Sequence, residues 1–528
     1  MNTLPLELRR IQMLPLPRQA DALLENPAAL QAFPAEELYG LVCSLGLEDA
    51  IELVQCTSPS QFCTLVDLAA WRGGSFQEAS LLAWLEAAHG EDEEAFFAKI
   101  QNLDMEILEL LFRRAVQIKQ VEEEAEDTSL EAMETVDARW RLEFLVKGGA
   151  QHVVRRMCET WMGKNALEFS RFLEAVRWSL PSESEETAFR FRNARLEDMG
   201  FPPREHAVSL FAWVDARQYC LAPRESALVE AGETLLEEGF RMLPEEQRQQ
   251  LEAEARYLVN NFLIAEGADA GDMEAIYDLS RQARDYLNLG LQHMTLGQRT
   301  LLAKALQEFG LKKIFQVGFS LTLDLKRAIE RMRKEPHAQW QNAWWTMDAL
   351  ASLLSALGAR RPCMWKEGQK AMLKTLADIA FAKAQLEKAR RQMRVMAALH
   401  QGEPHKALLP FGAELGVLRA ERFFCAALAH FVVEGKPRAK PFAAGATEAL
   451  EAKLCASPFP EVADSFARAL LSKEAAPEEA LFEEAQEMAG TCLQMLRAQL
   501  DASKAKRGDF FPEDILCLPM EGLALRHA

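Results

Sequence analysis

Two arginines, Arg192 and Arg195, are the side chains whose type and spacing best suit ligand chemistry in this sequence. A guanidinium stays charged, so on a packed helix face it needs a carboxylate, several carbonyl oxygens or a bound anion beside it. Its planar fork of N–H groups matches the oxygens of a carboxylate or phosphate. Two interpretations stay open, a structural ion pair and an anion site between helices, and both arginines are candidate ligand-binding residues.

Both arginines fall on the apolar stripe of the helix that is predicted to carry them. At about 100° per residue, the apolar positions cover an arc of roughly 220° that contains both guanidiniums. These positions are Ala188, Phe189, Phe191, Ala194, Leu196 and Met199. The arc predicts that at least one of the two arginines is mostly buried and paired with a carboxylate or a bound anion.

This helix has clear start and stop signals. The serines and glutamates of residues 182–186 favour a helix N-terminus, because anions there complement the partial positive charge of the first turn. Gly200 followed by Phe201 is the pattern of a left-handed helix cap, and the two prolines that follow cannot continue the helix. A second helix is expected from about Arg204, and the two apolar faces predict a helix hairpin over residues 183–215.

Catalytic and cofactor motifs are absent from the sequence. It contains no GxGxxG, GxxxxGK[ST], GxSxG or HExxH, and its ten cysteines include no CxxC pair. His430 and Glu434 lie four residues apart on a predicted helix, but two ligands do not make a metal site. We therefore predict no catalytic residue, no cofactor and no metal site.

The formal charge of −19 argues against general nucleic-acid binding, which needs a basic face to neutralise phosphates. One basic cluster stands out. It comprises Lys312, Lys313, Lys326, Arg327, Arg331, Arg333 and Lys334. Because Asp324, Glu330 and Glu335 are interleaved with it, the pattern favours solvated helix charge over a binding face.

The location of the protein is predicted from what the sequence lacks. The N-terminal residues contain prolines and no continuous apolar run, so they do not read as a signal peptide. No apolar run approaches the roughly 20 residues that would span a bilayer. We expect a soluble, cytoplasmic protein without a transmembrane segment, whose cysteines are mostly buried thiols.

Nearly every long segment shows the helical period, so the sequence predicts an all-α fold with more than about 60% helix, against a base rate of roughly one third. Short amphipathic helices with explicit caps, such as Ser58 with Gln61, indicate an irregular, solenoid-like array of antiparallel helices packed on a larger helical body. Four segments are expected. They are a short-helix array (1–120), a middle helical region (121–220), a helical body (221–435), and C-terminal helices with an irregular tail (436–528).

Three local predictions are more specific. Helices are expected to carry Trp140 and Phe144, and a long helix is expected to begin at Glu367. Trp340 and Trp344 are expected to share a helix face at i and i+4, packed against a neighbour.

Four stretches resemble an uncharacterised all-helical family of bacterial proteins of about this length, a domain-of-unknown-function family. They are residues 30–71, residues 189–211, the stretch YLNLGLQHM (286–294) and the stretch FQVGFSLTL (315–323). The resemblance covers nearly the whole chain and implies a helical fold but no catalytic residues. The short N-terminal helices also resemble, more faintly, the acidic cytosolic helical domain of a magnesium-transporter family.

The function expected first is that of a non-enzymatic cytoplasmic scaffold or adaptor whose helical surface binds another protein. One alternative is an enzyme or sensor with an inter-helix anion pocket near Arg192 and Arg195. Another is a regulator that responds to divalent cations at an acidic helical surface. A pocket with convergent polar groups and a buried arginine would favour the anion site, whereas a large exposed apolar groove would favour the scaffold.

Overall fold

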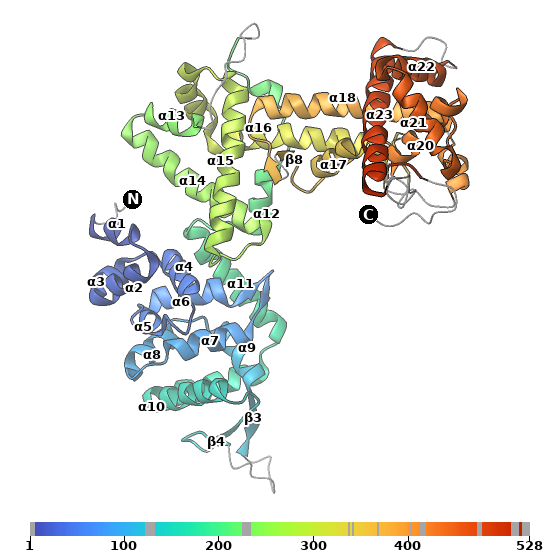
Figure 1. Cartoon of the computed structure of the whole chain (residues 1–528). Helices are drawn as coiled ribbons and strands as arrows, with labels where there is room; N and C mark the ends of the chain where they lie inside the picture. Colours follow the sequence, from blue (N-terminus) through green and yellow to red (C-terminus); the bar gives the residue numbers. More distant parts are fainter. Residues whose placement is uncertain are drawn as a thin grey trace. The chain divides into compact units, whose positions relative to one another are not determined.

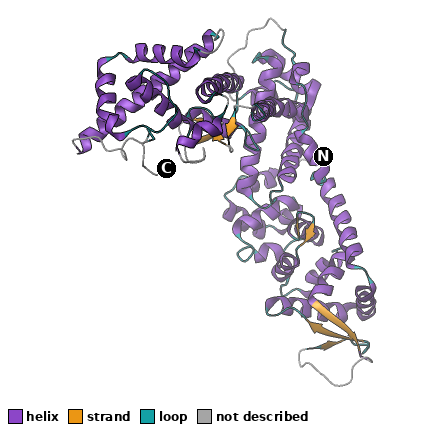
Figure 2. Cartoon of the chain, turned by 90° about the vertical axis from the view of Figure 1, so that its right-hand side faces the viewer, coloured by secondary structure: helices purple, strands orange, loops and turns teal. Residues whose placement is uncertain are grey.

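The computed structural model describes residues 6–121, 132–223, 234–335, 338–340, 343–366, 369–401, 403–411, 419–472, 478–507 and 517–519. Helix accounts for 73% of the structure, and the strands form only small antiparallel sheets (Figures 1 and 2). The predicted all-helical class is confirmed. The acidic run of residues 122–127 and most of the predicted C-terminal tail lie outside the described residues.

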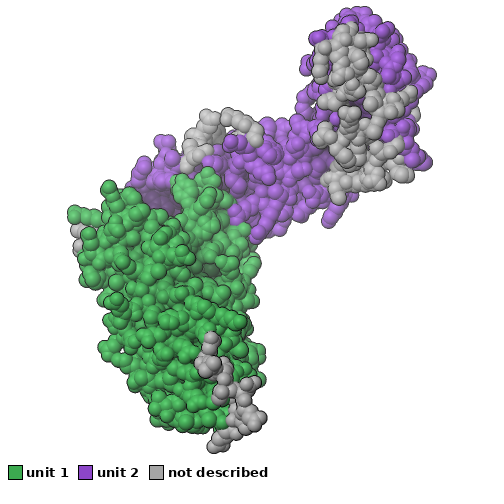
Figure 3. All heavy atoms as spheres, turned by 60° about the horizontal axis from the view of Figure 1, so that its bottom comes forward, with its two compact units in different colours: residues 1–212, 243–284 green, residues 213–242, 285–528 purple. Residues whose placement is uncertain are grey.

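The chain forms two compact units, which Figure 3 colours separately. Unit 1 contains Met1–Ala212 and Leu243–Arg284, and unit 2 contains Trp213–Met242 and Asp285–Ala528. Each unit therefore combines two separated stretches of the chain. The division into four segments remains a prediction.

Unit 1 begins with an array of short helices and is completed by longer ones. Its helices are α1 (Leu6–Gln12), α2 (Leu16–Glu25), α3 (Pro27–Ala32), α4 (Ala35–Leu45), α5 (Ile51–Gln55), α6 (Pro59–Ala69), α7 (Glu78–Ala88), α8 (Glu93–Gln101), α9 (Met105–Ala115), α10 (Gly149–Trp178), α11 (Pro181–Asp198), α12 (Arg204–Val208), the 3-10 helix η2 (Ser209–Phe211), α14 (Glu245–Glu266) and the first part of α15 (Met273–Thr295). α6 starts with the predicted capping box of Ser58 and Gln61. α9 packs against both α10 and α11, so the helix that carries the two arginines rests on the array.

The core of unit 1 runs without a break from α1 to α11. Aromatic rings fasten α9 to α10 within it. Phe172 meets Phe112 edge-on at 4.9 Å between ring centroids and stacks on Trp161 at 4.8 Å. Such aromatic pairs stabilise the fold beyond the burial of apolar area, so they stabilise the packing of α9 on α10.

A three-stranded antiparallel sheet follows α9, where the sequence predicted helices. Its strands are β3 (Val116–Gln120), β4 (Met133–Glu134) and β5 (Trp140–Phe144), in the order β3-β5-β4. The prediction that helices carry Trp140 and Phe144 is therefore wrong. Strand β5 alternates apolar and polar residues, so that Trp140 and Leu142 are buried on one face.

The predicted end of α11 is confirmed. The Gly200 N–H donates to the carbonyl oxygen of Glu197 at 2.9 Å, and the Phe201 N–H donates to that of Leu196 at 2.8 Å. These are the two bonds of a Schellman cap, and Gly200 has the positive φ of 91° that this cap requires.

Two details of this region differ from the sequence prediction. Phe191 and Ala194 are exposed, and the buried residues of α11 are Ser184, Ala188 and Leu196, so the packed face is narrower than the apolar arc. The second helix begins at Arg204 as expected, but α12 has only five residues and packs against α14. Apolar side chains are often exposed on helix surfaces. The arc of apolar residues is therefore wider than the face that is buried.

Unit 2 contains longer helices. They are α13 (Leu235–Arg241), the last part of α15, α16 (Leu302–Met332), α17 (Asp348–Leu357), α18 (Leu376–His400), α19 (Pro404–Leu408), α20 (Ala420–Glu434), α21 (Thr447–Ala456), α22 (Phe459–Leu471) and α23 (Glu479–Arg507), with the hairpins β6 (Gln339–Trp340) with β7 (Ala343–Trp344) and β8 (Cys363–Lys366) with β9 (Gln369–Met372). α16 is kinked at Gly310, and it packs against α13, α17 and α18.

Helices α15 and α16 approach each other at two glycines. A Cβ on Gly290 would lie 3.0 Å from the carbonyl carbon of Ile314, and one on Gly318 would lie 2.9 Å from the carbonyl carbon of Tyr286, with the carbonyl oxygens closer still. The stretches 286–294 and 315–323, which carry the family resemblance, thus meet at this crossing. Glycine allows the two backbones to come this close.

Two of the local helix predictions in unit 2 are wrong. Trp340 and Trp344 lie on the two strands of the β6–β7 hairpin rather than on one helix face. The helix expected from Glu367 begins at Leu376, and a β-hairpin precedes it. In both places a short apolar stretch fits strand and helix equally well, and cross-strand pairing decides between them.

The described residues show two further features. None of their helices combines the length and apolar character needed to cross a membrane. In the tail, Cys517 and Leu518 are buried, and the Phe442 N–H donates to the carbonyl oxygen of Pro519 at 2.8 Å. Residues 517–519 therefore pack against other parts of unit 2.

Candidate functional site

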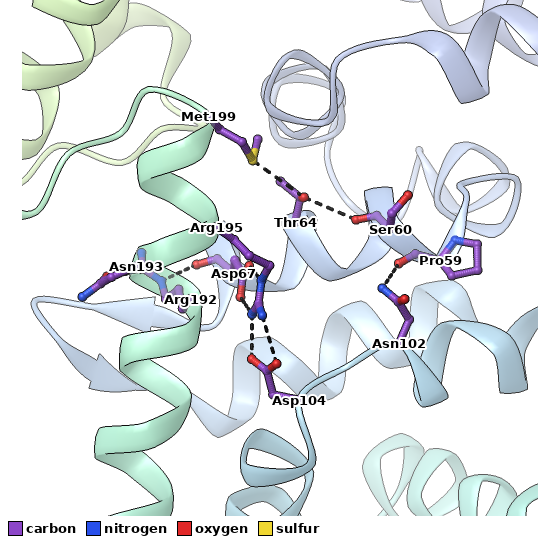
Figure 4. Close-up of polar contacts among 10 residues, drawn as sticks. All are labelled: Pro59, Ser60, Thr64, Asp67, Asn102, Asp104, Arg192, Asn193, Arg195 and Met199. Carbon is purple, nitrogen blue, oxygen red and sulfur yellow. Dashed lines mark hydrogen bonds and ion pairs between the residues drawn. The ribbon is translucent and has the colours of Figure 1, made fainter.

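Arg195 forms a four-bond bridge between two carboxylates (Figure 4). Its Nε and Nη2 donate to Asp67 at 2.7 and 2.8 Å, and its Nη1 and Nη2 donate to Asp104 at 2.9 and 2.6 Å. Asp67 lies on α6, and Asp104 directly precedes α9. One guanidinium therefore ties α11 to both helices.

The carboxylates of the Arg195 bridge are more deeply buried than its guanidinium. The Asp67 side chain is only 2% exposed, whereas that of Arg195 is 34% exposed. Arg195 is thus paired with carboxylates as predicted, but it is half-buried rather than mostly buried. Its hydrogen bonds to Asp67 raise the pKa of Arg195, while burial raises the pKa of Asp67 and the bonds from Arg195 oppose that rise.

Among the residues that the structure describes, Arg192 forms no ion pair with a carboxylate. Its Nε donates to the backbone carbonyl oxygen of Asp67 at 2.6 Å, and its Nη1 donates to Asn193 Oδ1 at 2.9 Å. The guanidinium lies 5.9 Å from the ring centroids of both Trp71 and Phe189. Burial lowers the pKa of Arg192 to about 10. Two of its five N–H groups are engaged in these bonds, so the cation is held in place with N–H groups to spare.

Arg192 lines a cleft in unit 1, here termed the unit-1 cleft, with a volume of about 520 Å³. Arg72, Arg192 and Arg204 all line it, and Asp269 is the carboxylate among the described lining residues. In the described part of the chain, none of the three arginines forms an ion pair with a carboxylate. The unit-1 cleft therefore has a net positive lining although the whole chain carries a formal charge of −19.

The rest of the lining is largely apolar. It includes Trp71, Phe189, Leu196, Phe201, Leu263 and Ile264. A cleft of this kind, apolar with a few fixed polar groups, is the usual form of a small-molecule site.

Three tight turns shape the unit-1 cleft. Arg72 ends strand β1 (Trp71–Arg72), which pairs with β2 (Ser75–Phe76) through Gly73 and Gly74, both with positive φ. Arg204 begins α12 after the Gly200 cap. The third turn follows α14, where Tyr39 Oη donates to Asp269 Oδ1 at 3.3 Å and the Gly271 N–H donates to the same oxygen at 2.8 Å. The Asp269 carboxylate is therefore engaged in hydrogen bonds that stabilise this turn.

The sequence pointed to Arg192 but not to its two companions in the unit-1 cleft. Arg72 lies in a two-residue hairpin and Arg204 follows a proline pair, and neither local pattern indicates a binding role. What Arg72, Arg192 and Arg204 share is their position in space, because β1, α11 and α12 come together only in the folded unit. Elsewhere, the buried His430 has its Nδ1 within hydrogen-bond distance of Glu434 Oε1, at 3.0 Å. Among the described residues, no three side chains that could hold a metal ion lie together.

Comparison with known proteins identifies a family. The chain matches no curated protein and no solved structure. A family of unknown function, DUF6178, matches residues 1–518. This match covers all four stretches on which the resemblance rests, including the glycine crossing of α15 and α16. The chain therefore belongs to the family of unknown function DUF6178.

Proposed function

We propose that the protein binds a small organic anion in the unit-1 cleft, with Arg192 as the principal ligand-binding residue. The observation that carries this proposal is the contrast between the two candidate arginines. Arg195 is paired with both Asp67 and Asp104, whereas the hydrogen-bond acceptors of Arg192 within the described chain are neutral oxygens. A cation in a partly desolvated position gains most from an anionic partner, and a bound carboxylate or phosphate would provide it.

The apolar lining adds to the expected chemistry of the ligand. Trp71, Phe189 and Ile264 offer hydrophobic surface beside the guanidiniums of Arg192 and Arg72. A ligand with an apolar body and one carboxylate or phosphate group would fit both. This form of the proposal makes the protein a binding protein or sensor and assigns no catalytic residue.

Ligand-induced stabilisation tests the proposal. We expect phenyl phosphate or benzoate to raise the melting temperature of the wild type more than sodium chloride at equal ionic strength. A ligand at ten times its dissociation constant adds about 1.4 kcal/mol to the free energy of unfolding. Differential scanning fluorimetry measures the melting temperature, and titration calorimetry measures the dissociation constant.

The matched variants are Arg192→Met and Arg190→Met. Arg190 lies on the same helix, is exposed and does not line the cleft. We expect the anion-dependent shift to disappear in Arg192→Met and to persist in Arg190→Met. A wild type that gains nothing from either probe, or an Arg192→Met variant that keeps the gain, would refute the assignment.

The cytoplasmic adaptor expected from the sequence remains a competing proposal. A cytoplasmic setting is supported by the ten cysteines, which are all free thiols. The anion experiment separates the two roles, because an adaptor without a ligand site would give no specific anion effect in unit 1. Regulation by divalent cations remains a prediction from the acidic composition.

A further inference from the structure

A second cleft lies within unit 2, here termed the unit-2 cleft, with a volume of about 920 Å³. It is formed by residues 213–217, α15, α16 with the turn that follows it, and α18. Helices α16 and α18 pack against each other (Figure 1). Its cationic lining residues are Arg217, Arg327, Arg331, Lys334, Lys383 and Arg390. Three of these, Arg327, Arg331 and Lys334, belong to the basic cluster of the sequence.

The lining cations divide into paired and unpaired groups. Arg217 pairs with Asp215 at 2.9 Å, Arg327 with Asp324 at 3.9 Å, and Arg390 with Glu387 at 2.8 Å. The remaining three cations, Arg331, Lys334 and Lys383, form no ion pair with any residue that the structure describes. Of the lining acids, Glu330 alone is likewise without an ion pair in the described chain, so the unit-2 cleft keeps an excess of positive charge.

The unpaired cations come from two neighbouring parts of unit 2, the end of α16 and α18. Arg331 lies in the last turn of α16 and Lys334 in the turn that follows it, where the Lys334 N–H donates to the carbonyl oxygen of Arg331 at 3.0 Å. Lys383 lies on α18, close enough to His293 for its charge to lower the pKa of that imidazole, whose main cause of lowering is burial. Like charges gathered in this way repel one another, and a multivalent anion between them would remove the repulsion.

Residues 213–217 are held against α15 and α16 by polar contacts. Ser320 Oγ accepts from the Val214 N–H at 2.9 Å, and His293 Nε2 donates to the carbonyl oxygen of Ala216 at 2.9 Å. Trp213 Nε1 donates to Asp324 Oδ1 at 2.9 Å, and the Arg327 guanidinium covers the Trp213 ring at 4.7 Å. Ser320 and His293 lie in the two stretches that meet at the glycine crossing, so the elements that carry the family resemblance also position residues 213–217.

We propose that the unit-2 cleft is a binding site for a compact polyanion with two or more phosphate groups, held by Arg331 and Lys334 at the end of α16 and by Lys383 on α18. Lysine binds phosphate as a point charge and arginine as a fork, so the three together suit clustered phosphate oxygens. The cations converge on one hollow rather than forming a long track, and the chain as a whole is strongly acidic. Both features favour a small ligand over a nucleic acid or an acidic protein. The site is independent of Arg192 and its ligand.

Inorganic triphosphate is the probe that tests this site. Titration calorimetry at constant ionic strength should show that the wild type binds triphosphate more tightly than pyrophosphate, and pyrophosphate more tightly than phosphate. The variant Lys334→Gln/Lys383→Gln should bind triphosphate at least about tenfold more weakly, since each residue supplies a charge-assisted contact. The control variant Lys304→Gln/Lys326→Gln makes the same charge change on α16 outside the cleft and should remain within about twofold of the wild type.

Folding controls and competing ligands show whether the unit-2 cleft is a specific polyanion site. All four lysines are at least partly exposed, so the circular dichroism spectra and melting temperatures of both double variants should match the wild type without ligand. Arg192→Met should retain triphosphate binding, which separates this site from the unit-1 cleft. Equal weakening in both double variants would reduce the effect to net charge and overturn the site. Failure of the wild type to bind triphosphate, or binding of polyglutamate or single-stranded DNA in preference to it, would also overturn it.

Discussion

Replacing Gly318 with alanine is expected to destabilise unit 2 by about 3 kcal/mol or more, a large effect for adding one methyl group. In an open helix the same change stabilises by roughly 1 kcal/mol, because alanine is the better helix former. Here the new Cβ would lie 2.9 Å from the carbonyl carbon of Tyr286 and 3.0 Å from the backbone nitrogen of Gly290. These are backbone atoms of another helix, so no side chain can rotate away to make room.

Gly290→Ala should behave in the same way, because its Cβ would meet the backbone of α16 at Ile314. The control is Gly490→Ala on α23, where the added Cβ would meet no described atom beyond the adjacent backbone of its own helix within 4 Å, and a small gain in stability is expected. Urea unfolding followed by circular dichroism gives the free energies. Amide hydrogen exchange in α15 and α16 shows whether the loss is local to the crossing. A Gly318→Ala variant as stable as Gly490→Ala would show that the two helices are farther apart than described.

Replacing Arg195 with methionine is expected to cost about 3 kcal/mol at neutral pH. The change keeps much of the side-chain volume but leaves Asp67, at 2% exposure, without its partner. Breaking a fully buried pair costs about 3–5 kcal/mol, and the 34% exposure of Arg195 places this case at the lower end because water screens the pair.

The pH dependence of the Arg195→Met variant follows from the same geometry. Burial already raises the folded-state pKa of Asp67, and the variant lacks the Arg195 bonds that oppose this rise. The folded variant therefore binds a proton at a higher pH than the unfolded chain, whose Asp pKa is about 3.9. Its stability falls as pH rises through the folded-state pKa, and the deficit relative to wild type shrinks as pH is lowered toward about 4.

Chemical denaturation of the wild type and Arg195→Met between neutral pH and about pH 4 measures this deficit. Asp67→Asn/Arg195→Met is the control, because without the buried carboxylate its stability should depend less on pH. Phosphate and sulfate should act equally on the wild type and on Arg195→Met, because Arg192 is unchanged in both. A deficit that is the same at every pH would show that Arg195 acts through packing rather than through the charge of Asp67.

Local sequence patterns predicted much of the fold. The cap at Gly200, the capping box at Ser58 and the predominance of helix all depend on hydrogen bonds between residues a few positions apart, which a short window of sequence contains. The strand β5 was within reach of the same reasoning. Its residues Trp-Arg-Leu-Glu-Phe alternate apolar and polar types, a period of two that the dominant helical pattern obscured.

The sequence by itself determined the helical class, the caps and the family, and it placed Arg192 and Arg195 on one helix. Only the tertiary structure decided that the two arginines differ. Asp67 and Asp104 lie 128 and 91 positions from Arg195 along the chain, and no local pattern reports which carboxylate a folded helix will meet. The lining of each cleft was decided in the same way, because Arg72, Arg192 and Arg204, or Lys334 and Lys383, come together only when separate elements pack. Backbone hydrogen bonding is local and recurs along the chain, whereas side-chain charge pairing depends on packing between distant segments.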